Sequence, residues 1–207
     1  MHGQDYERVV NEMTDRVYSE FEVREQGIKF KGKDSYVSSS CVGTSEEELE
    51  VKTITKKCRG VVKKTKSKGT GTGTLKESLH IPYDVFVEAY GMDLSGLKPG
   101  VYAYGTDSKH KEMSIVQRVY DEDDVMKLKA YPNCIIKSNM ARKIENGAEE
   151  VAETELEISV MPDDYGIGMY EMIADEKADQ ELIEKWMTEF TPDLVHTVVA
   201  ASEMGDE

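Results

Sequence analysis

Long apolar runs are absent from this sequence, and their absence excludes one class of protein. No stretch of its 207 residues approaches the roughly 20 consecutive apolar residues that a membrane-spanning helix needs. The first residues, MHGQDYERVVNEMTDR, are charged throughout, so we expect no secretory signal there. Hydrophobic residues nevertheless make up 39% of the chain, which is enough to build the core of one domain.

Cysteines and catalytic motifs are also scarce. The three cysteines are scattered and odd in number, which favours reduced thiols in a cytoplasm over a disulfide framework. No CxxC pair or close His/Cys cluster indicates zinc, no GxSxG elbow indicates a nucleophilic serine, and the four histidines lie in unrelated contexts. We therefore predict no catalytic residue, no metal ligand and no cofactor, and we expect that the protein is not an enzyme.

The glycine-rich stretch KGTGTGTLK has the composition of a phosphate-binding loop but not its order. A GxxxxGK(S/T) loop needs a lysine directly after its last glycine, whereas Gly73 is followed by Thr74 and Leu75. The stretch YGIGMY supplies only two of the three glycines of a dinucleotide loop. The acidic run 121–124 lacks the spacing of a calcium loop, so a solvated turn is the better interpretation.

Charge is abundant and unevenly distributed. Residues 1–104 hold 16 basic and 16 acidic residues, whereas residues 105–207 hold 10 and 25, which accounts for the net charge of −15. From Lys52 to Lys76 there are nine basic residues and no acidic one, and from Glu145 to Glu207 there are 19 acidic residues and two lysines. Either these are two solvated faces, or the basic segment of one copy meets the acidic surface of another in a head-to-tail contact.

Strand patterns dominate the chain. Runs of β-forming residues bounded by turn residues predict strands in IKFKG, SYVSSSCV, ELEVKTI, VYAYG, MSIVQRVYD, VMKLKAY, NCIIKSN and ETELEISV. We expect YGIGMYEMI to pair with ETELEISV after the turn MPDD. The strands are not separated by regular helices, which argues against a doubly wound nucleotide-binding fold.

The glycines of the basic segment are in phase with the apolar residues that follow them. Gly69, Gly71 and Gly73 share the odd-numbered positions with Leu75 and Leu79. In an extended chain these residues lie on one side, so the first part of the apolar face has only glycines and no side chains. Glycine inside a strand marks a bend or a close approach by another backbone, and we expect one of these here.

Two helices are predicted. Pro82 suits the first turn of a short central helix over about 82–90, and Gly91 suits its C-terminal cap. A C-terminal amphipathic helix is expected over about 175–190, because apolar residues recur there at every fourth position up to Phe190, before Thr191-Pro192.

These elements together predict an α+β, mostly β fold. We interpret residues 1–207 as a single domain. It is expected to carry an N-terminal arm over about 1–28 and an extended basic loop or arm over about 52–74.

Two stretches of the chain carry a resemblance to a known family. One is KGTGTGTLKESLHIPYDVFVEAYGM, a basic arm that leads into a strand and a short helix. The other is ELEISVMPDDYGIGMYEMIADEKADQELIEKWMTEF, in which two strands precede an acidic amphipathic helix. In the order of their elements and in residue composition they resemble the major tail protein, or tail tube protein, of long-tailed, non-contractile bacteriophages, particularly those of Gram-positive hosts.

The resemblance implies a structural virion protein with packed β-sheets, sandwich-like or barrel-like, and a flanking helix. It implies hexameric rings that stack head-to-tail into a tail tube, the conduit for DNA ejection into the host. The implied partners are further copies of the chain, the tape measure protein, and the tail terminator and distal tail proteins. DNA would cross the lumen without specific binding, no membrane would be bound, and the protein would reach the virion tail after assembly in the host cytoplasm.

Two sets of residues are candidates for a role in assembly. We expect the basic arm to reach an adjacent subunit through seven cations: Lys56, Lys57, Arg59, Lys63, Lys64, Lys66 and Lys68. The alternation of residues 153–160 puts Glu153, Glu155 and Glu157 on one side of a strand. These glutamates are candidates for the channel lining, and an ordinary solvent-facing strand side is the alternative.

A different class of protein also fits the basic segment. A soluble binding module could use Lys52–Lys76 to engage nucleic acid or an acidic protein partner, since cations that neutralise phosphates give salt-dependent affinity. The segment has no aromatic residue on which bases could stack, which favours the tube subunit.

Overall fold

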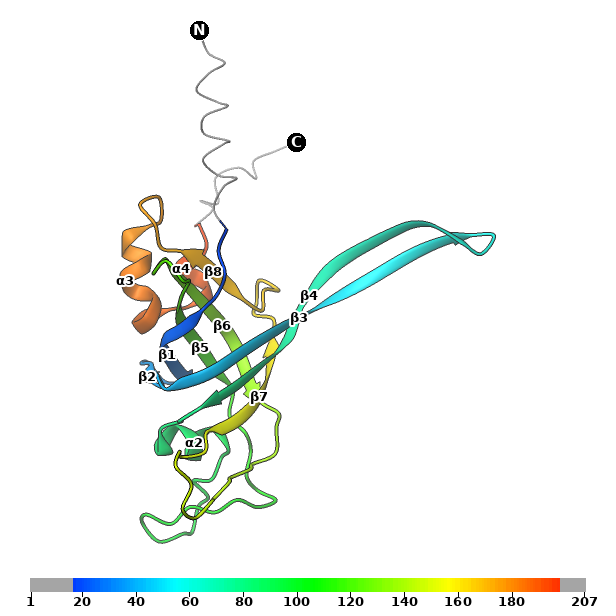
Figure 1. The fold of residues 1–207 in the computed structure, drawn as a ribbon. Helices are drawn as coiled ribbons and strands as arrows, with labels where there is room; N and C mark the ends of the chain where they lie inside the picture. The colour runs from blue at the N-terminus through cyan, green and yellow to red at the C-terminus, as the bar shows by residue number, and fades with distance from the viewer. Residues whose placement is uncertain (1–16, 198–207) are drawn as a thin grey trace, which may run out of the picture.

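A long hairpin projects from a body built on one antiparallel β-sheet (Figure 1). The computed structural model describes residues 17–197. The strands are β1 (Glu22–Phe30), β2 (Val37–Ser38), β3 (Val42–Cys58), β4 (Val61–Leu79), β5 (Met113–Tyr120), β6 (Met126–Ile136), β7 (Thr154–Met161) and β8 (Tyr170–Ile173). The helices are α2 (Tyr83–Ala89), α3 (Gln180–Glu189) and α4 (Pro192–Val195). The α+β, mostly β class predicted from the sequence is confirmed.

The sheet curls until its two ends approach each other. The strand order is β2-β1-β5-β6-β7-β4-β3, and β8 pairs with β6. Although β1 and β3 lie near opposite ends of this order, they contact each other. Gln26 of β1 reaches across and donates a hydrogen bond to Glu77 of β4 at 3.0 Å. The packed layers that the sequence predicted are thus formed by one sheet folding over itself.

Apolar side chains fill both faces of β5. Ile115 faces a core that includes Phe86 of α2, whereas Val116 faces a second core closed by Trp186 and Phe190. Each face therefore has its own helix, because successive side chains of a strand point to opposite sides. The predicted central helix lies where expected.

The C-terminal helix starts five residues later than predicted, at Gln180. Asp179 caps it by accepting hydrogen bonds from the backbone N–H groups of Glu181 and Leu182. Residues 175–178 form a turn in front of this cap, in which Ala178 N–H donates to the carbonyl of Asp175. The helix ends at Glu189, and Pro192 begins α4.

Three strand predictions are wrong in detail. VYAYG, residues 101–105, forms no strand, because backbone bonds such as Ala103 N–H to the Met92 carbonyl hold it in a loop after α2. VMKLKAY and NCIIKSN are one strand, β6, that runs through Pro132. Pro132 is tolerated because it lies between the part of β6 that pairs with β8 and the part that pairs with β7, beside a register shift of β5. YGIGMYEMI supplies β8, which pairs with β6 instead of β7.

The N-terminal region contributes to the body as well. Residues 22–28 of the predicted N-terminal arm belong to β1, which pairs with both β2 and β5. Residues 1–16 of that arm lie outside the described residues.

Candidate assembly interface

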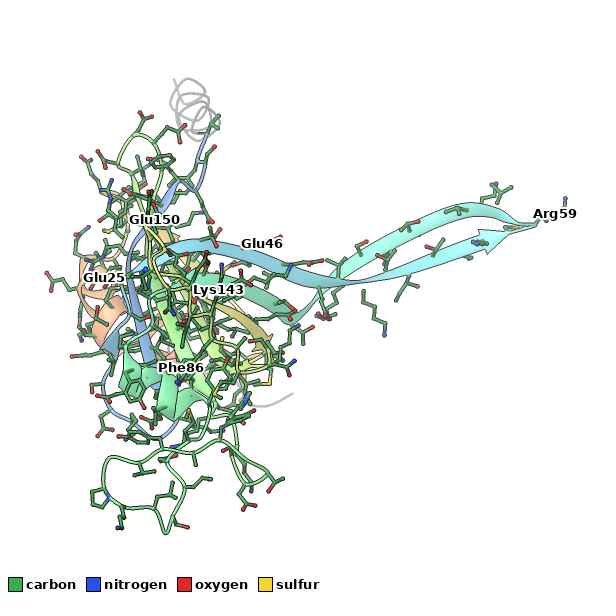
Figure 2. All side chains as sticks on the ribbon, turned by 60° about the horizontal axis from the view of Figure 1, so that its bottom comes forward. Glu25, Glu46, Arg59, Phe86, Lys143 and Glu150 are labelled. Atoms are coloured by element: carbon green, nitrogen blue, oxygen red, sulfur yellow. The ribbon has the colours of Figure 1, made fainter. Side chains whose placement is uncertain are left out.

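The arm is the distal part of the β3–β4 hairpin, residues 51–68, and it extends far from the body (Figure 2). Every one of its residues is exposed. At the tip, Arg59 and Gly60 have φ of 49° and 80°, the positive values of the two-residue turn that suits strand twist. The predicted basic loop is therefore an ordered hairpin, and all seven candidate cations lie on it.

The two faces of the arm differ in chemistry. Residues directly opposite in the ladder point to the same side, and the pairs are Lys52 with Lys68, Ile54 with Lys66 and Lys56 with Lys64. We call this side, with its five lysines around one isoleucine, the lysine face. The other side carries the pairs Thr53–Ser67 and Thr55–Thr65, and the hydroxyls of Thr53 and Ser67 lie 3.0 Å apart. Between the pairs Lys52–Lys68 and Lys56–Lys64, one face is cationic and the other is neutral, whereas Lys57, nearer the tip, shares the odd phase of Thr53 and Thr55.

This arrangement is unfavourable for the arm on its own. Like charges directly opposite each other in a ladder are destabilising, and the lysine face contains two such pairs, Lys52–Lys68 and Lys56–Lys64. A two-stranded hairpin without a packed face is at best marginally stable. Four large apolar side chains of the arm are also exposed: Val51 at 66%, Ile54 at 64%, Val61 at 58% and Val62 at 52%. Positive charge with exposed apolar area is typical of a surface that a partner covers.

The root, which we define as residues 42–50 and 69–79 of the same two strands, lies on the body. Between the pairs Leu49–Gly73 and Val51–Gly69, β4 has three residues where β3 has one, so the ladder bulges at Gly71. Gly71 has φ +76°, and a Cβ there would lie 2.6 Å from the carbonyl oxygen of Gly166. A Cβ on Gly168 would lie 2.1 Å from the carbonyl oxygen of Gly71. The sequence prediction of a bend or a close backbone approach is confirmed, and both occur.

Hydroxyl groups fix the bulge from the other strand. Thr70 donates to the carbonyl of Glu50 at 3.1 Å, and Thr72 donates to the Glu50 carboxylate at 2.9 Å. The Thr70 and Thr72 hydroxyls lie 2.6 Å apart. The threonines that alternate with the glycines therefore determine the direction in which the arm leaves the body.

The root carries a buried carboxylate on its inward side. Glu77 is 3% exposed and accepts hydrogen bonds from Gln26 at 3.0 Å and Gln117 at 2.9 Å. Burial raises the pKa of Glu77 from its ordinary value of 4.5 to about 7, and the two amide donors oppose part of that rise. Because these three residues come from β4, β1 and β5, they join the root to the opposite layer of the curled sheet.

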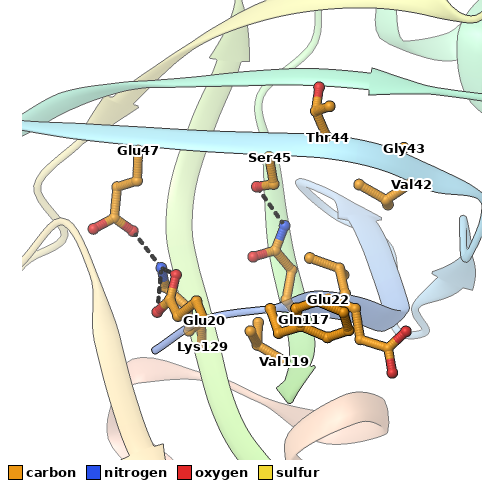
Figure 3. A pocket seen from close by; sticks show the side chains of 12 residues that line it. Glu20, Glu22, Val42, Gly43, Thr44, Ser45, Glu47, Gln117, Val119 and Lys129 are labelled. Atoms are coloured by element: carbon orange, nitrogen blue, oxygen red, sulfur yellow. Dashed lines mark hydrogen bonds and ion pairs between the residues drawn. The ribbon is translucent and has the colours of Figure 1, made fainter. Parts of the chain in front are cut away.

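A polar cavity of about 390 Å³ lies between β3 and the strands beneath it (Figure 3). Lys129 of β6 is nearly buried there, and its Nζ lies 3.0 Å from a Glu47 oxygen and 3.2 Å from a Glu20 oxygen. Tyr131 also donates a hydrogen bond to Glu47. A buried cation held between two carboxylates fixes the position of the root, since removing one partner leaves a charge uncompensated.

The channel-lining candidates lie on and beside β7. Leu156, Ile158 and Val160 are buried and the glutamates occupy the alternate positions, as the sequence pattern indicates. Glu157 forms an ion pair with Lys137 at 3.1 Å, and Glu153 accepts a hydrogen bond from Ser78. The three glutamates therefore lie at alternate positions of β7 and of the residue before it, apart from the arm.

Sequence reasoning missed the lysine face, Glu77 and Lys129. The even-numbered spacing of Lys52, Lys56, Lys64, Lys66 and Lys68 is the signal for the first. Glu77 shares the odd-numbered positions of Leu75 and Leu79, and this pattern indicates that its carboxylate is buried. No pattern around Lys129 distinguishes it from an ordinary surface lysine.

Among residues 17–197, no group of three or more His, Cys, Asp or Glu side chains could hold a metal ion. In the acidic run 121–124, Asp121 accepts the backbone N–H groups of Asp123 and Val125, so this carboxylate stabilises its own turn. Within the same described part of the chain, no helix is long and apolar enough to cross a membrane.

Comparison with known proteins finds distant structural likeness alone. No protein-family model and no curated protein matches the chain. A chain of the six-fold symmetrised anti-feeding prophage baseplate superposes with a TM-score of 0.42 at 8% identity, covering 77% of this chain and 99% of that one. A chain of the anti-feeding prophage tube-terminating cap gives a TM-score of 0.38 at 8% identity, covering 77% and 97%. Likenesses this loose carry no argument about function, which is argued below from the chain itself.

Proposed function

We propose that this protein is a structural subunit of a bacteriophage tail tube, which assembles with copies of itself into stacked hexameric rings that conduct DNA to the host. The observation that carries the proposal is the arm. Residues 52–68 hold eight cations and no acidic residue, and every one of them is exposed. An acidic surface of a neighbouring subunit would relieve the repulsion within the arm and cover its apolar side chains.

The rest of the molecule supplies the complementary charge. Residues 105–207 hold 25 acidic residues against 10 basic ones. Such a surplus offers sites for the arms of neighbours, and it lets a channel repel the DNA backbone so that the polymer slides. Glu153, Glu155 and Glu157 are our candidates for that channel face. By resemblance, the tape measure, tail terminator and distal tail proteins are the other partners.

Self-assembly of the purified protein tests the proposal. Concentrated wild-type protein should form rings or hollow tubes of uniform width in electron micrographs. The triple variant Lys63→Glu, Lys64→Glu, Lys66→Glu should stay monomeric with an unchanged circular dichroism spectrum, because these changes lie on the exposed arm. Normal tubes from the variant would rule out an inter-subunit role for the arm.

The lysine face also supports the second candidate, a module that binds nucleic acid. A monomer that never assembles but retards duplex DNA at low salt, and releases it steeply as salt rises, would favour that function.

A further inference from the structure

A groove on the body has the features expected of a receptor for the arm. Its volume is about 1210 Å³, and it lies between the end of β4 and the segment 141–155. Four carboxylates line it: Glu145, Glu150, Glu153 and Glu155. Two apolar side chains lie among them with most of their surface in solvent, Ile144 at 89% and Val151 at 82% exposed.

Arg142 and Lys143 line the groove with four glutamates, so they neutralise only part of its negative charge. The Arg142 guanidinium lies 4.4 Å from the centre of the Phe86 ring, and Lys143 pairs with Glu145 at 2.8 Å. Among the described residues, Glu150 and Glu155 form no ion pair. The groove therefore keeps unneutralised negative charge beside exposed apolar surface.

We propose that this groove receives the lysine face of the arm of a second copy. The inference rests on the proposed function and deepens it by naming the surface that the arm contacts. On the arm, Ile54 lies between Lys52 and Lys56 along the strand and opposite Lys66. In the groove, apolar side chains lie among carboxylates. Docking pairs apolar with apolar and cation with anion, which relieves the repulsion on both surfaces.

A second copy is the occupant because the arm of the same chain lies elsewhere. Figure 2 shows Arg59 at the tip of the arm, far from Lys143 and Glu150 on the body. A nucleic acid does not fit the groove, since phosphates would meet its carboxylates. The opposite side, with its pairs Thr53–Ser67 and Thr55–Thr65, offers the groove no cation along that length, so the arm docks with one defined face.

The groove and the predicted channel face share Glu153 and Glu155. An arm seated in the groove covers both residues and removes them from the channel lining. The experiment below therefore also decides between the two places for these glutamates.

Reciprocal charge reversal tests the contact. The arm variant Lys64→Glu, Lys66→Glu and the groove variant Glu150→Lys, Glu155→Lys should each need about tenfold or more higher concentration to assemble, because like charges then face each other. Mixed in equal amounts they should assemble together, since each arm then meets a groove of opposite charge. The control Lys57→Glu, Lys63→Glu makes the same charge change off the lysine face and should assemble nearly as wild type does.

Four results would overturn the assignment, and they differ in what else they overturn. Wild-type tubes with no rescue in the mixture, or a control as defective as the arm variant, would reject the groove and leave the tube subunit standing. Wild-type protein that stays monomeric at every concentration would reject both. Retention of DNA that depends on Lys64 and Lys66, without assembly, would favour the nucleic-acid module.

A cross-link gives an independent measurement. With Cys41→Ser and Cys58→Ser to remove the exposed thiols, the pair Ile54→Cys and Val151→Cys should form disulfides between copies in assembled tubes. Non-reducing gels should show a ladder of linked subunits. A second pair, Ile54→Cys with Val17→Cys, puts the other cysteine outside the groove. Tubes that link through this pair and not through Ile54→Cys with Val151→Cys would show that the arm contacts another surface.

Discussion

The arm and its root are parts of the same two strands, yet they follow different rules. In the root, Leu75, Glu77 and Leu79 are buried, and alternation separates an inward side from an outward side. In the arm, nothing is buried, and over residues 52–56 and 64–68 alternation separates a cationic side from a neutral one. The folding of the single chain explains the root, whereas it leaves the arm exposed, and for the arm we propose a partner.

We therefore expect the root to determine the stability of the monomer and the arm to determine contacts between copies. Substitutions in the root should change the free energy of unfolding of the monomer. Substitutions in the arm should leave that quantity nearly unchanged and should alter contacts between copies.

The largest expected effect compares one aliphatic residue in each region. Leu75→Ala removes a fully buried side chain and should lower the free energy of unfolding by about 2–5 kcal/mol. Ile54→Ala, on the exposed arm, should change it by no more than about 0.5 kcal/mol. Urea unfolding of dilute monomer measures both, and equal losses would mean that the arm packs on the body.

The second effect depends on pH. Because the folded pKa of Glu77 is about 7 and its ordinary value is 4.5, the folded protein binds more protons than the unfolded chain between these pH values. The contribution of Glu77 to stability is therefore greatest below pH 4.5 and falls by about 3 kcal/mol as pH rises through 7. Glu77→Gln cannot titrate, so it should remove this decline and be the more stable protein at pH 8.

The matched control for this measurement is Glu48→Gln on the neighbouring strand. Glu48 is exposed, so its substitution should leave the pH dependence of thermal unfolding as in wild type. A Glu77→Gln profile that overlays the wild-type profile would show that the carboxylate is not buried in solution.

The third effect concerns the glycines at the boundary between the two regions. Gly168→Ala should destabilise the monomer by about 1–3 kcal/mol, because its Cβ would overlap the carbonyl oxygen of Gly71 and force the backbones apart. Gly69→Ala meets open space, so we expect between no change and about 1 kcal/mol of stabilisation. Calorimetry with electron microscopy of each variant separates loss of stability from loss of assembly.

The smallest effect is within the arm. Lys56→Glu replaces a like-charge pair with Lys64 by an opposite-charge pair, worth about 0.2–1 kcal/mol to the local ladder. Hydrogen exchange of arm amides in the monomer should slow by a few-fold, while global stability stays unchanged. Slower exchange across the whole sheet would contradict the separation of arm from root.

Much of the fold could be predicted because local patterns determine it. The phase of Gly71 with Leu75 and Leu79 indicated a close backbone approach, but Gly168, which makes it, is distant in sequence and could not be named. The helix α3 starts after Asp179 and not at about residue 175, because the Asp179 side chain caps the helix there. The apolar spacing before Asp179 does not determine where the helix begins.

The site was predicted less completely than the fold. The cations of the arm were found from composition, but the even-numbered lysines of the two strands lie on one face only because Lys63 is left unpaired in the ladder, and the sequence does not show this register. The groove depends on segment 141–153, which forms neither helix nor strand, so periodicity says nothing of its shape. Gln26 and Gln117 meet Glu77 only because the sheet curls.

The close approach of Gly71 and Gly168 also lies at the base of the arm, so a small rotation there would move the tip of the arm by a larger distance. From Gly69 to the turn at Gly60 the strand spans about 30 Å, so a tilt of roughly 10° at the glycines displaces the tip by about 5 Å. Such a tilt leaves the hydrophobic core unchanged. In the proposed tube, each subunit would hold its neighbour through such an arm. The tube would then bend through many small rotations at the bases of the arms. Its stiffness would then depend on the two glycines and on the threonine hydroxyls that bond to Glu50.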